Sequence, residues 1–346
     1  MRQLARYAFA NARVRALLSQ LLDEAAWRRL LEARDLQEVL SLLQSTPYGR
    51  ILASFTGVKE ELVGLERTLK RQDIALHRKL ARSVSGEKEK SLILLLCQRY
   101  EVEELKTALR LWHGKPAVEP ERYLLGETIL APIDFSQVVT ARSLEEIIVL
   151  LDETDYKLPL IKARLRFQET GSLFFLEASL DLDYYRRLVE ATRHLSSMDR
   201  QIARVLIGLE IDQENINWLV RQRLYYSLGL EQFLEWVIPG GCHISQESIR
   251  ASYVADGHQH IMEALARGPY QALKKFSGED FHLMERFLHE VLLHQVKKTL
   301  AGFPFTIGTL LGYLILKKRE TKLLLSLCYG KAAGLSQPDI ERLIVP

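Results

Sequence analysis

Apolar residues recur at the spacing of an α-helix along nearly the whole chain. In RSLEEIIVLLDETDYKLPL, which begins at Arg142, leucine and isoleucine return every three or four residues, so they fall on one side of a helix. Long alternations of apolar and polar residues between turn residues, which are typical of strands, are scarce. The pattern predicts an all-α protein.

The predicted helix starts carry side chains that can satisfy free backbone N–H groups. Asp35, Ser143 and Ser336 each stand three residues before a carboxylate, and in this arrangement the side-chain oxygen accepts a hydrogen bond from the first turn. Breaks are predicted at residues 114–120 (GKPAVEP) and 239–241 (PGG), because proline lacks an N–H donor and glycine raises the entropic cost of a helix. We expect the breaks to join separate helical units.

One long apolar run raises the question of a membrane span. Residues 299–316, TLAGFPFTIGTLLGYLIL, carry no formal charge and would form a helix roughly 27 Å long, at the lower edge of what crosses a bilayer core. Pro304 breaks the run early and leaves about twelve residues from Phe305 onward, a length typical of a buried helix. Lysines flank the run on both sides and give none of the asymmetry that orients a spanning helix. We predict a buried interior helix.

The chain resembles itself at intervals of roughly 110 residues. RDLQEVLSLLQSTPYGRIL, from Arg34, lines up with the segment from Arg142, and more loosely with HQHIMEALARGPYQALKKF, from His258. Each copy has a polar start, an apolar helical stripe, a polar break and a tyrosine. These tyrosines are separated by 108 and 114 residues: Tyr48, Tyr156 and Tyr270.

A second series of residues repeats in the same order as the first. RYEVEELKTALRL contains Glu104, EIDQENINWLVRQR contains Glu214 and KKRETKLLLSL contains Glu320, with separations of 110 and 106 residues. Both series together predict three helical repeat units, at residues 1–114, 115–228 and 229–346. The units would either surround a pseudo-threefold axis or form an extended stack in which each touches only its neighbours.

Composition narrows the classes of function. Lys plus Arg number 47 against 44 for Asp plus Glu, and the resulting net charge of +3 does not give the concentrated positive field expected of a nucleic-acid-binding protein. The three cysteines are an odd number and lie far apart without CxxC spacing, which argues against a disulfide framework and indicates a reducing, cytoplasmic compartment. GxxxxGK[ST], GxGxxG, HExxH and GxSxG motifs are all absent from the sequence. We therefore predict no catalytic residue, no cofactor, no metal site and no direct nucleotide binding.

The repeated glutamates allow two interpretations. Each is followed by apolar positions and then by a cation, which is Arg221 in the middle copy. They are either equivalent acidic groups around a central opening that meets a partner, or members of ion pairs that support the fold. The candidates for partner contact are Glu104, Glu214, Asn215, Arg221 and Glu320.

Three ordered segments resemble a known family. They are NARVRALLSQLL with the following LSLLQSTPYG, then EIDQENINWLVRQR, and last PFTIGTLLGYLILKKRETKLLLSLCYGKAAGL. Together they are similar to the C subunit of the V/A-type ATPases, whose eukaryotic counterpart is the d subunit of V-ATPases, over essentially the whole chain. The family favours an asparagine after the repeated glutamate, which Asn215 keeps and from which Leu105 and Thr321 depart. The three units are therefore not expected to have equal roles.

The resemblance implies a funnel-shaped body of three similar helical domains without catalysis of its own. In the family, the C subunit rests on the membrane proteolipid ring at the cytoplasmic face, as a peripheral protein, and receives the central shaft made by the D and F subunits. The resemblance therefore implies an adapter of the central stalk, through which torque couples ATP hydrolysis or synthesis, in the A and B subunits, to proton or sodium transport. The alternative is a free helical-repeat scaffold that binds a protein partner along a concave surface.

Overall fold

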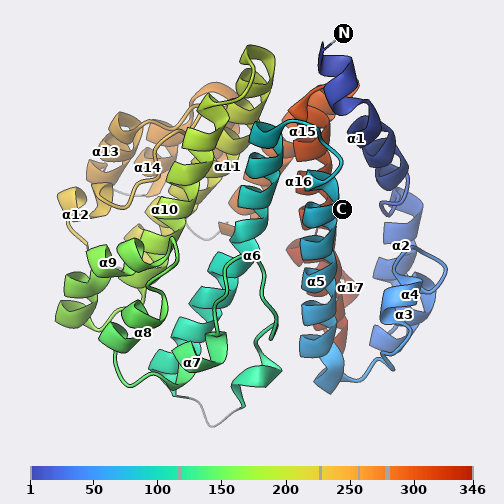
Figure 1. Ribbon diagram of the computed structural model, residues 1–346, viewed down its shortest axis with the longest axis horizontal. Helices are drawn as coiled ribbons and strands as arrows, with labels where there is room; N and C mark the ends of the chain where they lie inside the picture. The colour runs from blue at the N-terminus through green and yellow to red at the C-terminus, as the bar shows by residue number, and fades with distance from the viewer. Residues whose placement is uncertain (1, 116–118, 226–227, 256–257, 277–280, 345–346) are drawn as a thin grey trace. The chain divides into compact units, whose positions relative to one another are not determined.

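The computed structural model describes residues 2–115, 119–225, 228–255, 258–276 and 281–344. Throughout these ranges the regular structure is helical and no residue is in a strand (Figure 1). The predicted all-α class is therefore confirmed. Most helices follow one another after short connections, as the helical spacing of apolar residues requires.

The α-helices have the following bounds: α1 Arg2–Leu18, α2 Glu24–Glu32, α3 Leu36–Leu43, α4 Gly49–Leu52, α5 Leu62–Ala81, α6 Glu87–Gly114, α7 Phe135–Thr140, α8 Leu144–Leu150, α9 Lys157–Thr170, α10 Phe174–Arg193, α11 Ser197–Tyr225, α12 Leu230–Leu234, α13 Gln246–Val254, α14 His258–Leu265, α15 Phe281–Ala301, α16 Ile307–Ala332 and α17 Gln337–Leu343. Three 3₁₀ segments in the same ranges are η1 Lys59–Glu61, η2 Pro120–Arg122 and η3 Gly268–Lys275.

Helix lengths recur along the chain. A helix of 20 or 21 residues is followed by a longer one at α5 and α6, at α10 and α11, and at α15 and α16, where the longer helices have 28, 29 and 26 residues. Short helices or a 3₁₀ segment precede each pair. This recurrence agrees with the sequence repeat, and the division into three units at residues 114 and 228 stays a prediction.

The predicted caps are present. The N–H of Glu38 donates to Asp35 Oδ1 at 2.9 Å, that of Glu146 to Ser143 Oγ at 3.3 Å, and that of Asp339 to Ser336 Oγ at 3.4 Å. At the first predicted break, α6 ends at Gly114, and residues 116–118 lie outside the described residues. The second break is confirmed, since residues 239–241 lie outside any helix. Gly240 there has a φ of +100°, a conformation that side-chain-bearing residues rarely adopt.

The long apolar run is divided as its proline predicts. Pro304 lies in the break between α15 and α16, and residues 306–314 are buried, so the expected interior helix is confirmed. The buried carboxylate of Asp199 accepts the Ile307 N–H at 2.8 Å and so satisfies a free donor in the first turn of α16. Among the described helices, none has the length and apolar character needed to cross a bilayer.

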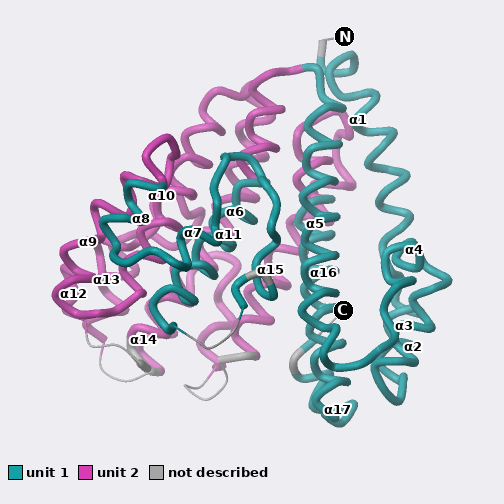
Figure 2. Tube along the Cα trace, turned by 60° about the horizontal axis from the view of Figure 1, so that its bottom comes forward, with its two compact units in different colours: residues 1–85, 97–150, 313–346 teal, residues 86–96, 151–312 magenta. Residues whose placement is uncertain are grey.

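The chain forms two compact units, each assembled from separated segments (Figure 2). Unit 1 comprises residues 1–85, 97–150 and 313–346, and unit 2 comprises residues 86–96 and 151–312. In unit 2, α9 packs on α10, α10 and α15 pack on α11, and α13 packs on α14.

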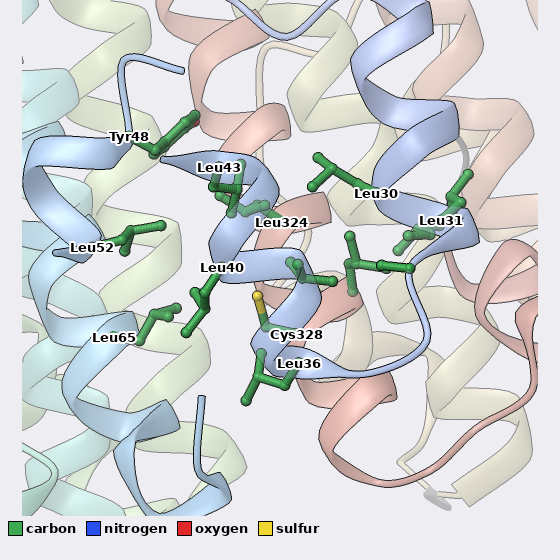
Figure 3. Packing of buried hydrophobic residues seen from close by; sticks show 14 of the residues in the cluster. Leu30, Leu31, Leu36, Leu40, Leu43, Tyr48, Leu52, Leu65, Leu324 and Cys328 are labelled. Atoms are coloured by element: carbon green, nitrogen blue, oxygen red, sulfur yellow. The ribbon is translucent and has the colours of Figure 1, made fainter. Parts of the chain in front are cut away.

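The core of unit 1 joins helices from both ends of the chain. Leu36, Leu40 and Leu43 of α3 belong to the same buried cluster as Leu324 and Cys328 of α16 (Figure 3). Burying a leucine side chain contributes about 2 kcal/mol, so α16 is a principal support of the early helices.

Candidate functional site: buried carboxylates of the long helices

Glu320 on α16 holds two distant segments of unit 1. Its Oε2 accepts the N–H of Leu22, between α1 and α2, at 2.6 Å. Its Oε1 accepts the hydroxyl of Tyr48, which directly precedes α4, at 2.6 Å. Lys317, one turn earlier on α16, places its Nζ 3.2 Å from the same oxygen. Glu320 is 5% exposed, and through these bonds it acts as a clamp between α16 and the two segments.

Tyr48 completes this clamp. Its hydroxyl accepts a hydrogen bond from Lys317 Nζ at 2.6 Å, and the same ammonium lies 4.2 Å from the centre of the tyrosine ring. Burial, together with the negative charge of Glu320, holds the pKa of Tyr48 far above its ordinary value. Tyr48 therefore stays protonated and keeps donating to the carboxylate.

A cavity of about 340 Å³ adjoins this clamp. Tyr48, Lys317 and Asp73 are among the residues that line it, and Asp73 Oδ2 accepts the hydroxyl of Tyr100 at 3.3 Å. Burial raises the pKa of Asp73 to about 6, although the charge of Lys317 opposes the shift. The cavity has a buried acid and a cation on its walls, but both are already used within unit 1.

Unit 2 contains a clamp of the same kind around Asp212 on α11. Asp212 Oδ2 accepts the His243 N–H at 2.9 Å and the Tyr270 hydroxyl at 3.1 Å, and Oδ1 accepts the Ile244 N–H at 3.1 Å. Burial raises the pKa of Asp212 to about 6, and the hydrogen bonds from the two backbone amides and Tyr270 limit that shift. The acid joins α11 to the segment before α13 and to η3.

Asp212 is not among the residues that the sequence repeat selected. It lies 108 residues after Glu104 and 108 before Glu320, an even spacing that the sequence already contained. Glu214, which the repeat selected instead, is half-buried on the same helix and accepts the Tyr185 hydroxyl at 3.3 Å. The tyrosine of the third repeat copy, Tyr270, bonds to Asp212 and not to Glu214.

Two acids occupy the corresponding region of α6. Glu104, 3% exposed, accepts the N–H of Leu125, and burial raises the pKa of its carboxyl. Glu101 accepts the N–H groups of Leu130 and Ala131 at 2.7 and 2.8 Å. Sequence reasoning missed Glu101 as well, because its partners stand about thirty residues further along the chain.

One spacing recurs among the clamped amides. One amide bound by Glu320, one bound by Glu101 and one bound by Asp212 each stand 26 residues before a repeat tyrosine, and the pairs are Leu22 with Tyr48, Leu130 with Tyr156, and Ile244 with Tyr270. This spacing is a sequence signal that would have located the clamped segments.

The remaining candidates also lie on α11. Asn215 bonds to both backbone groups of Ile238, donating from Nδ2 to the carbonyl oxygen at 2.8 Å and accepting the N–H at Oδ1 at 2.9 Å. Arg221 is about half exposed and lies 3.3 Å from Glu285. Among the five candidates, Arg221 is thus the one most accessible to a partner, while Glu104, Glu320 and Asn215 are buried.

The contacts of these acids lie within the fold. Within the described ranges, no group of three or more His, Cys, Asp or Glu side chains is placed to hold a metal ion. The buried carboxylates instead accept backbone N–H groups, which fixes loops against helices.

Comparison with known proteins identifies the family. The family model described as "ATP synthase (C/AC39) subunit" matches residues 10–343. The chain belongs to this family. The C subunit of the A-type ATP synthase of Methanocaldococcus jannaschii is 24% identical over 349 residues, covering 99% of this chain and 87% of that protein. The resemblance inferred from the sequence is confirmed, and the family is one of ATP synthase subunits.

Other members of the family show the same likeness. The A-type ATP synthase C subunit of Methanosarcina mazei is 27% identical, covering 98% of this chain and 92% of that protein. The counterpart in Archaeoglobus fulgidus is 26% identical, with 99% and 96% covered. The similarity to these C/AC39 proteins extends over nearly the full length of both partners.

Proposed function

We propose that this chain is the non-catalytic central-stalk adapter of a rotary V/A-type ATPase. The observation that carries the proposal is the family match over residues 10–343. The chain would link the shaft of the D and F subunits to the membrane proteolipid ring, so that torque couples ATP hydrolysis or synthesis to proton or sodium transport. Nucleotide chemistry would take place in the A and B subunits.

The proposed location is the cytoplasmic face of the membrane, where the protein is held peripherally by its complex. The proposed shape is a funnel of three similar helical domains, and the recurring pairs of long helices support it. Carbonate extraction tests the location, because an adapter held by protein contacts is expected in the supernatant. Retention in the lipid pellet would contradict it.

Rigidity gives this role its physical content. An adapter transmits torque only if it resists twist, and packed helices deform less than flexible linkers. The clamps of Glu320 and Asp212 support this, since each ties a long helix to loops by charge-assisted hydrogen bonds.

Among the candidate contact residues, we assign the direct contact with the shaft to Arg221 and Glu214. Glu104, Glu320 and Asn215 would act through the fold, because they are buried and bonded within this chain. Interface charges that are exposed steer association and fix orientation, which buried ones cannot do.

Substitutions separate the two roles. Arg221→Glu is expected to weaken binding to the purified D and F proteins while leaving the melting temperature unchanged, and Glu104→Gln and Glu320→Gln are expected to lower the melting temperature. Arg286→Glu is the matched control, because Arg286 is a similarly exposed arginine of unit 2 that pairs with Glu290. Equal loss of binding in Arg221→Glu and Arg286→Glu would refute the assignment of Arg221.

The decisive experiment is an affinity purification of the tagged chain from mildly solubilised membranes of its source, followed by mass spectrometry. Recovery of the proteolipid with the A, B, D and F subunits is expected. Recovery of none of them, from an extract in which the complex is intact, would overturn the proposal and favour the free scaffold.

A further inference from the structure

Helix α9 of unit 2 exposes a ridge of large apolar side chains. Leu158, Ile161 and Leu165 are 63%, 36% and 64% exposed, whereas Leu160 and Ala163 on the other side of the helix are fully buried. On its other side α9 packs on α10 (Figure 1). A helix that is apolar on both its buried and its exposed faces is expected to have a second contact.

The spacing of the ridge fits a partner helix. Leu158, Ile161 and Leu165 stand at positions i, i+3 and i+7, which form the continuous seam along which two helices pack side by side. Three such residues cover about two turns, or roughly 10 Å of helix. A partner therefore needs an apolar seam of similar length.

A pocket of about 300 Å³ lies beside this ridge. Leu165 forms part of its wall, and the buried side chains of Leu182 and Trp236 also line it. A ring contact with Phe175, at 5.6 Å between centroids, supports Trp236 from within the unit. A pocket whose lining includes buried apolar side chains is a place where one large side chain of a partner can contribute strongly to binding.

The charges at the pocket favour an acidic partner. Lys162, Arg166 and Arg186 line it together with Asp183 and Glu235. Asp183 is bound by Arg187 at 2.8 Å, and Arg166 pairs with Glu169 at 3.4 Å.

Among the charged side chains that line the pocket, the unpaired cations outnumber the unpaired acids. In the described ranges no acidic side chain pairs with Lys162 or Arg186, and of the two acids that line the pocket only Glu235 lacks a cation partner. Two unpaired cations against one acid give the surface a net attraction for carboxylates.

A bilayer fits this surface less well than a protein does. A bilayer offers no discrete side chain to fill the pocket. The combination of a ridge, a neighbouring pocket and unpaired cations is instead typical of helix recognition.

We propose that α9 and the adjacent pocket bind an acidic amphipathic helix of a protein partner. The apolar seam of that helix would pack on Leu158, Ile161 and Leu165, and one large side chain would enter the pocket against Trp236. Its carboxylates would meet Lys162 and Arg186. This inference goes beyond the proposed function and does not depend on it, because the surface belongs to unit 2 alone.

The test uses the full-length chain and three probes. The first is a labelled amphipathic peptide of about 18 residues, long enough to form helix, with leucines in an i, i+3, i+7 seam and glutamates beside it. The second has lysine in place of every glutamate, and the third is a vesicle of anionic phosphatidylglycerol. Fluorescence anisotropy is expected to show the acidic peptide binding at least about tenfold more tightly than its lysine counterpart.

Variants locate the binding. Leu158→Ser with Leu165→Ser is expected to weaken binding of the acidic peptide by at least about tenfold. Lys162→Glu with Arg186→Glu is expected to reverse the preference, so that the lysine peptide binds better. All these side chains are exposed, so the melting temperature should not change.

Matched controls lie on the same unit. Val254→Ser removes a side chain that is 68% exposed on α13, and Arg193→Glu reverses an exposed charge on α10, and neither should alter peptide binding. Absence of binding, equal affinity for both peptides, or losses as large in the controls would overturn the proposal. Vesicle binding that depends on Leu158 and Leu165, without peptide binding, would overturn it in favour of a lipid surface.

Discussion

Replacing Asn215 by alanine isolates one buried side-chain-to-backbone contact. The amide of Asn215 satisfies both the N–H and the carbonyl of Ile238, and both residues are almost fully buried. In Asn215→Ala the two backbone groups of Ile238 lose their partner and have no access to bulk water. Each unsatisfied buried group costs about 1–3 kcal/mol, so the free energy of unfolding should fall by about 2–5 kcal/mol.

The assay is equilibrium unfolding in urea, followed by far-ultraviolet circular dichroism at pH 7. The matched control is Asn217→Ala on the same helix, because the amide oxygen of Asn217 is buried without a hydrogen-bond partner. That control should change the unfolding free energy by less than about 1 kcal/mol.

A second substitution at the same position tests the donor alone. Asn215→Asp keeps an oxygen for the Ile238 N–H but turns another oxygen toward the Ile238 carbonyl, so it should destabilise at pH 7. Stability should recover as the pH falls, because a protonated carboxyl can donate again. If Asn215→Ala and Asn217→Ala lose equal stability, or Asn215→Asp shows no recovery in acid, the reasoning is refuted.

Further predictions concern the clamps and one close helix contact. Glu320→Gln leaves Lys317 largely buried without its counter-charge, so the free energy of unfolding should fall by about 2–4 kcal/mol. The size of this loss should change little in 1 M salt, whereas a strong salt dependence would indicate a solvent-exposed pair. Burial raises the pKa of Asp212 to about 6 from 3.8, so the folded chain holds the proton more tightly than the unfolded chain does. The free energy of unfolding should therefore fall as the pH rises from about 4 to about 6. An equal dependence of that free energy on pH in Asp212→Asn would contradict this. Gly208→Ala places a methyl group 2.6 Å from Cys242 Sγ, which should lower the melting temperature and reduce the free energy of unfolding by about 1–3 kcal/mol. Adding Cys242→Ala should restore part of that stability. A Gly208→Ala variant as stable as the original chain would refute the close contact.

Local features of this fold were readable from the sequence. Asp35 caps the N–H of a residue three positions away, so the pattern of residue types carries the whole interaction. The break at Pro304 is local in the same sense, because proline disturbs only the turn that contains it. The all-α class follows from the same short-range periodicity.

The contacts of the candidate site were not readable in this way. Glu320 was found through the repeat, but its partner Leu22 lies 298 residues away, and no local pattern records that distance. Asp212 was missed because the repeat was anchored on Glu214. Two residues apart on a helix are roughly 200° apart around its axis, so these side chains face nearly opposite sides. The two compact units are likewise built from separated segments, which only tertiary contacts define.

The bonds across unit 1 also determine when this protein can finish folding on the ribosome. The N–H of Leu22 cannot bond to Glu320 until α16 has been synthesised. The carbonyl of Leu31 likewise bonds to Lys331, which is synthesised 300 residues later. At about 5–20 residues per second, the first helices spend roughly 15–60 s without the C-terminal helix that completes their core. During that interval the apolar side of α3, including Leu36 and Leu40, lacks its final cover. Because the helix that covers this segment comes last in the sequence, the nascent segment needs protection from aggregation during synthesis.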